Sequence, residues 1–280
     1  MKTKISILII LLTFCINLYS QNIKYTATDI LSNGIFGGIG TCLTKGHFDK
    51  NNFWKGFKKG CISGVVINAS KQLLTTQVNK EDQILDWKVV WSSRIINEMG
   101  NSMLSNSITN KKLFSNLSFD IGFIKLNWNK NNPVQIEPIS LISTIYLLSS
   151  DRKFILKKSL IAGIPVFEYR WPRIITIDTL ERSMTSRPKH LGQAIGNNII
   201  LQKNVSCSDV FIHELIHSYQ RKQFIPTNYF IPCYKKISNW KFLYLDVSSF
   251  DIMYGFQFLT VGYKNIYWEK EANSFALEKE

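Results

Sequence analysis

The stretch FIHELIHSYQ, residues 211–220, carries two histidines four positions apart with a glutamate directly after the first. In a helix this spacing puts His213 and His217 one turn apart on one face, where two imidazoles can bind the same zinc ion. Glu214 lies about 100° around the helix from His213, near enough to reach a metal-bound water without ligating the metal. We therefore expect a metal-binding helix with Glu214 as general base.

The other side of this helix is apolar, which indicates how it packs. Its residues are Phe211, Ile212, Leu215, Ile216 and Tyr219. We expect this side to pack against a sheet while the histidines face a cleft. Two histidines on one helix are often ordinary polar residues, but half of the four histidines in the chain fall in this one motif.

A zinc ion at a catalytic site keeps one coordination position for water and takes three protein ligands, whereas a structural zinc ion takes four. The downstream acidic candidates for a third ligand are Asp246, Asp251, Glu269, Glu271 and Glu278. The segment WEKEANSFA, residues 268–276, predicts a helix near the C-terminus. Helical geometry places Glu269, Asn273 and Ala276 on one face, with Glu271 pointing about 160° away from Glu269.

The two motifs together resemble the gluzincin metallopeptidases, in which HExxH is followed by a helix carrying ExxA(D/N). The resemblance covers only about residues 207–277 and implies Zn²⁺ as the cofactor. It implies His213, His217 and Glu269 as the metal ligands, and Asn273 as the residue that orients a zinc-binding histidine. Asn273 stands where many gluzincins have Asp, and Glu271 remains the alternative ligand. The resemblance also implies a peptide or protein as the substrate.

Less specific signals concern the oxyanion that forms when a peptide carbonyl is attacked. Related enzymes stabilise it with a Tyr, His or Arg side chain, and the sequence offers His190, Tyr263, Tyr267 and Arg221 for that role without distinguishing them. The segment Ala194–Gln202, just before the metal helix, is expected to be a strand. As an edge strand it could hold an extended peptide by backbone pairing.

The first residues have the order of a secretory signal peptide. Lys2 and Lys4 precede an apolar run, residues 5–18, which ends before the small or polar residues Ser20 and Gln21. This run is short for a membrane-spanning helix, so we expect residues 1–20 to be cleaved. The protein is then exported to a periplasmic, cell-envelope or extracellular location of a bacterium.

A helical region is expected next, over residues 21–110, with Trp87–Asn106 as its last helix. Residues 25–77 predict two helices that form a hairpin, with glycines spaced four apart that let the backbones approach closely. The glycines are Gly34 and Gly38 in the first helix and Gly56, Gly60 and Gly64 in the second. Because lysines interrupt the apolar residues, we expect residues 25–77 to form a hairpin that is either soluble or in peripheral contact with a membrane, rather than a spanning segment.

Residues 111–280 are expected to form the zinc metallopeptidase-like domain. Four segments rich in strand-forming residues predict its sheet: Phe119–Trp128, Ile139–Leu148, Ile174–Leu180 and Ala194–Gln202. The predicted fold class is α+β: a helical N-terminal region with a glycine-rich hairpin, then a mixed sheet packed on the HExxH helix and on a C-terminal ligand helix.

The net charge of +14 is spread along the chain without a long basic run or a nucleic-acid-binding motif, so no nucleic-acid partner is predicted. The sequence thus favours an exported zinc-dependent metallopeptidase. Two alternatives stay open. One is a non-enzymatic envelope protein that binds or assembles partners on a metallopeptidase-like fold. The other is a zinc hydrolase that acts on substrates other than peptides.

Overall fold

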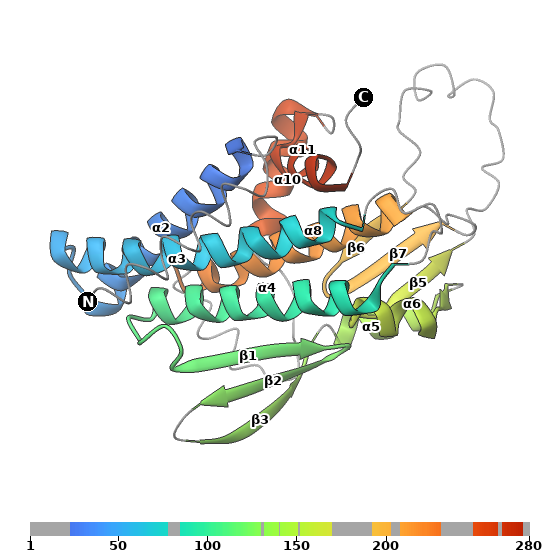
Figure 1. Cartoon of the computed structure of the whole chain (residues 1–280), viewed down its shortest axis with the longest axis horizontal. Coiled ribbons are helices and arrows are strands. Elements are labelled where there is room, and N and C mark those ends of the chain that lie inside the picture. Colours follow the sequence, from blue (N-terminus) through green and yellow to red (C-terminus); the bar gives the residue numbers. More distant parts are fainter. Residues whose placement is uncertain are drawn as a thin grey trace.

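The computed structural model describes nine stretches of the chain. They are residues 23–77, 85–129, 132–139, 141–150, 152–169, 192–202, 208–230, 249–262 and 265–276. The expected signal peptide, the expected strand Ile174–Leu180, and the oxyanion candidates His190 and Tyr263 lie outside these residues. The described part combines helices with two small sheets, as the α+β prediction requires (Figure 1).

Three long helices form the N-terminal part, as predicted: α2 (Ile23–Lys45), α3 (Lys50–Thr75) and α4 (Trp87–Ile108). The carboxylate of Asp49 caps α3 by accepting the backbone N–H of Asn52, which marks where the second helix of the hairpin begins. Glycines let α2 and α3 touch backbone to backbone. A Cβ atom at Gly60 would stand 2.0 Å from the carbonyl oxygen of Asn33, so no larger residue fits there.

Two sheets follow. The first is an antiparallel meander in the order β1-β2-β3, formed by β1 (Asn116–Ile121), β2 (Ile124–Asn129) and β3 (Asn132–Pro138). The second has the order β4-β5-β7-β6, with β5 and β7 parallel and the other pairs antiparallel. Its strands are β4 (Lys153–Phe154), β5 (Val166–Tyr169), β6 (Gly192–Ile195) and β7 (Asn198–Gln202).

Three of the strand predictions were wrong in detail. Phe119–Trp128 and Ala194–Gln202 are not single strands, because each contains a tight turn between two antiparallel strands. Gly122 and Gly196 supply the positive φ angles, 59° and 62°, that these turns need. Ile139–Leu148 is mostly a helix, α5 (Leu141–Leu148), because a short apolar run does not by itself distinguish a strand from a helix.

The helix that carries His213 and His217 lies between the second sheet and the N-terminal helices (Figure 1). It is α8 (Ser208–Phe224), and its predicted apolar side is buried against β7, β6 and the last helix. The remaining elements are α6 (Leu156–Ala162), η2 (Ile225–Phe230), α10 (Ser249–Val261) and α11 (Tyr267–Ala276). Ile199 and Leu201 of β7 share one core with Ile212 and Leu215 of α8 and with Phe275 of α11, so this core sets the position of both motif helices.

A buried group of charges ties the N-terminal helices to the motif helices. The ammonium group of Lys71 on α3 lies 2.9 Å from the carboxylate of Asp29 on α2 and 2.5 Å from that of Glu271 on α11. Gln223 of α8 accepts a hydrogen bond from Lys71 and donates one to Asp29. The two carboxylates raise the pKa of Lys71 against the opposing effect of burial, so the lysine is charged. The region 21–110 and the motif helices therefore share one polar core.

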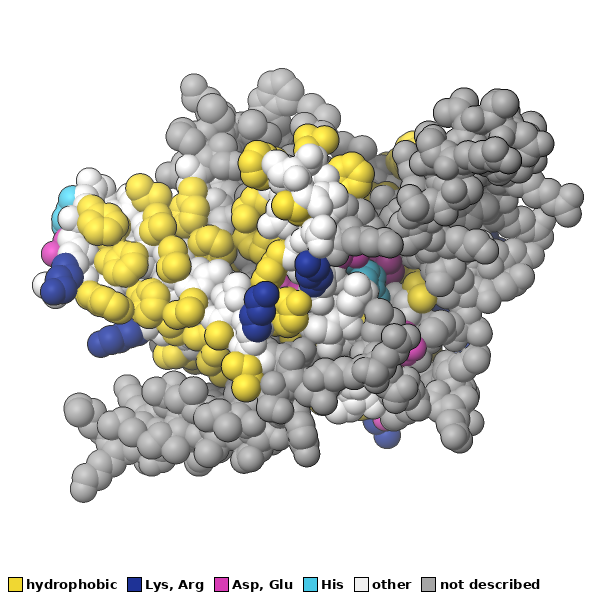
Figure 2. Space-filling model, turned by 90° about the horizontal axis from the view of Figure 1, so that it is seen from above, with side chains coloured by type: hydrophobic (Ala, Val, Ile, Leu, Met, Phe, Trp, Pro, Cys, Tyr) yellow, Lys and Arg dark blue, Asp and Glu magenta, His cyan; other side chains and the backbone are white. Residues whose placement is uncertain are grey.

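The outer side of the hairpin is apolar and basic. Exposed hydrophobic residues on it include Leu31, Ile35, Leu43, Phe48 and Trp54. Figure 2 shows hydrophobic side chains spread over the part of the visible face that the hairpin forms, with basic side chains at its end. Among the described residues, no helix is long and apolar enough to cross a membrane.

Replacing Lys71 with methionine should destabilise the fold strongly, because Asp29 and Glu271 would stay buried beside each other without a counter-charge. We expect the free energy of unfolding to drop by about 3–5 kcal/mol, measured by chemical denaturation. Lys58→Met, an exposed change on the same helix, is the control and should alter stability by less than about 0.5 kcal/mol. Equal stability of the two variants would contradict this role of Lys71.

Candidate metal centre

The two histidines of α8 lie on its side away from the core, as their spacing predicted. Their rings are perpendicular, with centroids 4.6 Å apart, and their Nε2 atoms are 3.0 Å apart. His217 is buried and His213 is partly exposed. Histidine and acidic side chains are visible from outside near the middle of the face in Figure 2. The pair is thus preformed, with His213 on its solvent side.

Glu269 of α11 completes a group of three. Its carboxylate oxygens lie 3.3 Å from the Nε2 atom of His213 and 3.2 Å from that of His217. The three donor atoms all lie within 4.8 Å of one another, the one such group of His, Cys, Asp and Glu side chains among the described residues. Ligand atoms held tetrahedrally at about 2.0–2.1 Å from zinc lie roughly 3.3 Å apart. The spacing of these donors therefore fits a zinc ion.

The chemistry of the donors fits as well. Two imidazole nitrogens and one carboxylate are a known ligand set of catalytic zinc sites, which leave one position open. Hydrogen bonds from the two histidines and from the Tyr254 hydroxyl outweigh burial and hold the pKa of Glu269 below its usual range. Tyr254 of α10 donates that hydrogen bond over 2.5 Å to Oε1. Glu269 is therefore ionised and held in place.

Gln220 fixes the orientation of His217. Its side-chain nitrogen donates to the carbonyl oxygen of Trp268, which can only accept, and to the carboxylate of Glu271. The amide oxygen must then be the atom that faces His217 Nδ1, at 2.7 Å. An amide oxygen accepts only, so Nδ1 carries a proton, and Nε2 is the nitrogen that can bind a metal once its own proton has left.

The structure does not give this role to Asn273. Asn273 is exposed on α11, whereas Gln220 is buried and contacts His217 directly. The expected orienting residue is thus corrected from Asn273 to Gln220. One turn along α8 separates His217 from Gln220, a shorter path than a reach from α11.

Glu271 is also excluded as the alternative ligand, because its carboxylate is used elsewhere. One oxygen lies 2.5 Å from the ammonium group of Lys71 and the other accepts from Gln220. Burial raises the pKa of Glu271 to about 7, with Asp29 adding to the effect and Lys71 opposing it. Glu271 reaches the metal centre only through Gln220.

Glu214 is buried beside β6. The backbone N–H of Ala194 donates to its carboxylate, and the chain passes so close at Gly192 that a Cβ atom there would stand 2.7 Å from Glu214 Cγ. Burial raises the pKa of Glu214, with Glu269 adding to the effect and the two histidines opposing it. A carboxylate whose pKa is shifted upward is better suited to accept and return a proton near neutral pH.

Sequence reasoning missed Gln220 and Tyr254. The first had a usable signal, since a residue three positions after His217 lies on the same side of the helix. Tyr254 had none, because α10 meets the site only through the tertiary fold. Arg221, one of the candidates for stabilising the oxyanion, forms an ion pair with Asp251, one of the acidic candidates for a third ligand.

Comparison of the chain with protein-family models, with curated proteins and with solved structures found no significant match. The resemblance to gluzincins therefore rests on the residues of the two motifs.

Replacing Gln220 with alanine should weaken metal binding without removing a ligand. Because His217 loses the acceptor that sets its tautomer, we expect zinc affinity to fall by about 10–100-fold. The hydrogen bond and charge of Glu269 outweigh burial and raise the pKa of His217 to about 9, so protons compete with the metal. Competition titration with a chelator at one fixed pH is the measurement. Asn273→Ala is the control, and an equal loss in both variants would contradict the assignment.

Proposed function

We propose that the protein is an exported zinc-dependent metallopeptidase of the gluzincin type. The observation that carries the proposal is the convergence of His213, His217 and Glu269, from two helices, with donor spacing that fits zinc. Zinc held by these residues would polarise a carbonyl and lower the pKa of a water molecule.

The residues around the ligands have separate roles in this proposal. Glu214 takes the proton of the attacking water and returns it to the leaving amine, for which its buried position and upward-shifted pKa suit it. Ala194 holds the Glu214 carboxylate by its backbone N–H. Tyr254 and Gln220 hold Glu269 and His217 in place.

The preference for a peptide substrate is supported by the position of β6. In the described part of the sheet β6 is at the edge, whereas β7 lies between β5 and β6. Of the expected strand Ala194–Gln202, only the first part is therefore suited to pair with an extended peptide, and Gly192–Ile195 is the segment we propose for it. Its contact with Glu214 would bring the paired peptide next to the general base.

Glu214 also separates this proposal from a non-enzymatic binding protein on the same fold. A structural metal site has no use for a buried carboxylate kept beside the ligands by a close-passing glycine. A zinc hydrolase of other substrates would use the same ligands, so substrate profiling distinguishes it from a peptidase.

The test combines metal content with hydrolysis of a quenched fluorescent peptide library by the mature protein. Wild type should hold one zinc and cleave peptides. Glu214→Gln should keep the zinc but lose on the order of 10²–10⁴-fold in rate, because the proton acceptor is gone. His213→Ala should lose the metal. Wild type that binds no zinc under metal-replete conditions would overturn the proposal, and Glu214→Gln with full activity would remove the assigned mechanism.

We also propose that the α2–α3 hairpin binds peripherally to an anionic lipid surface. Lys45, Lys50, Lys55 and Lys58 accompany its exposed apolar residues, so both hydrophobic burial and charge attraction would favour contact.

In vesicle sedimentation, the protein should bind vesicles containing an anionic lipid more tightly than zwitterionic ones, and added salt should weaken the binding. Phe48→Ser combined with Trp54→Ser should reduce binding, since both side chains are exposed on the hairpin. Ile145→Ser, an exposed apolar change on α5, is the control. Binding that is equal for all three proteins would place the contact elsewhere.

A further inference from the structure

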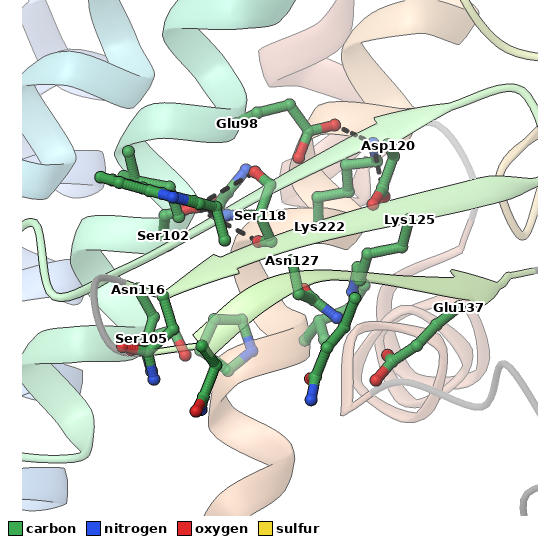
Figure 3. Close-up of a pocket in the computed structure, with 18 of the residues that line it drawn as sticks. Glu98, Ser102, Ser105, Asn116, Ser118, Asp120, Lys125, Asn127, Glu137 and Lys222 are labelled. Atoms are coloured by element: carbon green, nitrogen blue, oxygen red, sulfur yellow. Dashed lines mark hydrogen bonds and ion pairs between the residues drawn. The ribbon is translucent and has the colours of Figure 1, made fainter.

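A cavity lies away from the candidate metal ligands, between α4, the β1–β3 sheet and the C-terminal end of α8 (Figure 3). Its volume is about 410 Å³, which is within the range of small-ligand sites. The side chains labelled in Figure 3 come from all three of these parts and are polar or charged. The cavity is open to solvent at β3, where Asn132 and Gln135 are exposed, and its lining is mainly polar.

The sheet turns its polar face toward this cavity. The strand register places Ser118 opposite Asn127 and Asn127 opposite Gln135, so these three side chains line up across the strands. The same face continues with the residues Asn116, Asp120, Lys125, Asn129 and Glu137.

The apolar face of the same strands is left partly in solvent. Ile121, Val134 and Ile136 alternate with the cavity residues and are 42%, 55% and 69% exposed. A sheet with one covered face normally buries its apolar residues and exposes its polar ones. The reversed orientation costs hydrophobic burial, so the inward polar face has to be explained by what it contacts.

Helix α4 supplies a matching polar stripe on the opposite wall. Glu98, Asn101, Ser102 and Ser105 follow helical spacing and all line the cavity. Ser102 is tied to the sheet, since its hydroxyl accepts the backbone N–H of Ser118 and lies 3.2 Å from the Ser118 hydroxyl. The two walls are thus held at a fixed separation.

Two buried acceptors on these walls have no hydrogen-bond partner among the residues that the structure describes. They are Oδ1 of Asp120 and Oδ1 of Asn101, on side chains only 4% and 7% exposed. Both residues have used their other polar atoms: Asp120 Oδ2 pairs with Lys222, and Asn101 Nδ2 donates to Asn97. Because both oxygens are buried, the polar groups within reach of a ligand are those of less buried lining residues such as Asn127, Gln135 and Ser105.

The charges around the cavity nearly balance. Lys222 of α8 pairs with both Glu98 and Asp120, and Lys125 stands opposite Asp120 and Glu137 in the strand register. An anion would meet these carboxylates, and a hydrocarbon chain would leave the amides and hydroxyls unpaired. What fits is a neutral ligand with many hydroxyl groups, each able to donate and to accept.

We propose that this cavity is a carbohydrate-binding site for a neutral sugar. Ligand hydroxyls exchange hydrogen bonds with the amides of Asn127 and Gln135 and with the hydroxyl of Ser105. The site is independent of the proposed metal chemistry, although α8 contributes residues to both.

The test uses the mature full-length protein and soluble neutral oligosaccharides, namely oligomers of N-acetylglucosamine and of glucose, with titration calorimetry and saturation-transfer NMR. We expect at least one series to bind. Asn127→Ala and Gln135→Ala should each weaken binding by about tenfold, because each removes one side chain that pairs with the sugar. Ile136→Ala, on the exposed face of the same sheet, is the matched control and should bind like wild type.

Insoluble chitin and starch in a parallel pull-down distinguish a polymer-bound glycan from a free oligosaccharide, and either source supports the site. Absence of binding to every neutral sugar at millimolar concentration would overturn the proposal. So would sugar binding that Asn127→Ala and Gln135→Ala leave unchanged while both variants stay folded by circular dichroism. Inorganic phosphate and a short fatty acid serve as negative probes, and preferential binding of either in the cavity would also overturn it.

Discussion

The charge on Lys71 is the constraint on which the arrangement of the chain depends. A lysine buried without partners would lose its proton or destabilise the packing of its helix. Here two carboxylates from different helices form ion pairs with the ammonium group. Glu271 in turn accepts a hydrogen bond from Gln220, and the amide oxygen of Gln220 accepts one from His217. The candidate metal centre is therefore positioned partly by the N-terminal helices, although those helices contribute no ligand to it. The polar core and the site form one connected network.

The sequence was sufficient where periodicity and side-chain chemistry act locally. The spacing of His213 and His217 predicted both the helix and its apolar back, and glycines four apart predicted the close α2–α3 contact. The choice of Glu269 over Glu271 followed from helical geometry and the motif, and the structure brings Glu269 to the histidines while Lys71 engages Glu271. These features need few long-range contacts to be specified.

What the sequence did not reveal depends on contacts between distant segments. Gln220 has the role expected for Asn273, because Asn273 faces solvent on α11. The spacing of the motif does not determine how α11 is rotated about its own axis. Short apolar segments such as Ile139–Leu148 were predicted as single strands, because length and composition do not distinguish a strand from a hairpin or a helix. The inward polar face of the first sheet could not be predicted either, since alternation shows that two faces differ but not which one is enclosed.

The pairing of Lys71 with Glu271 also has a consequence for how the chain reaches its native state. The two residues are 200 positions apart. While the chain is being synthesised, α2 and α3 can pair Lys71 with Asp29, but the contact with α11 must wait until the residues between Lys71 and Glu271 have been added. Closing so long a loop is slow compared with forming the helices. The candidate ligand Glu269 lies two residues before Glu271, so the candidate metal centre would assemble after the α2–α3 hairpin.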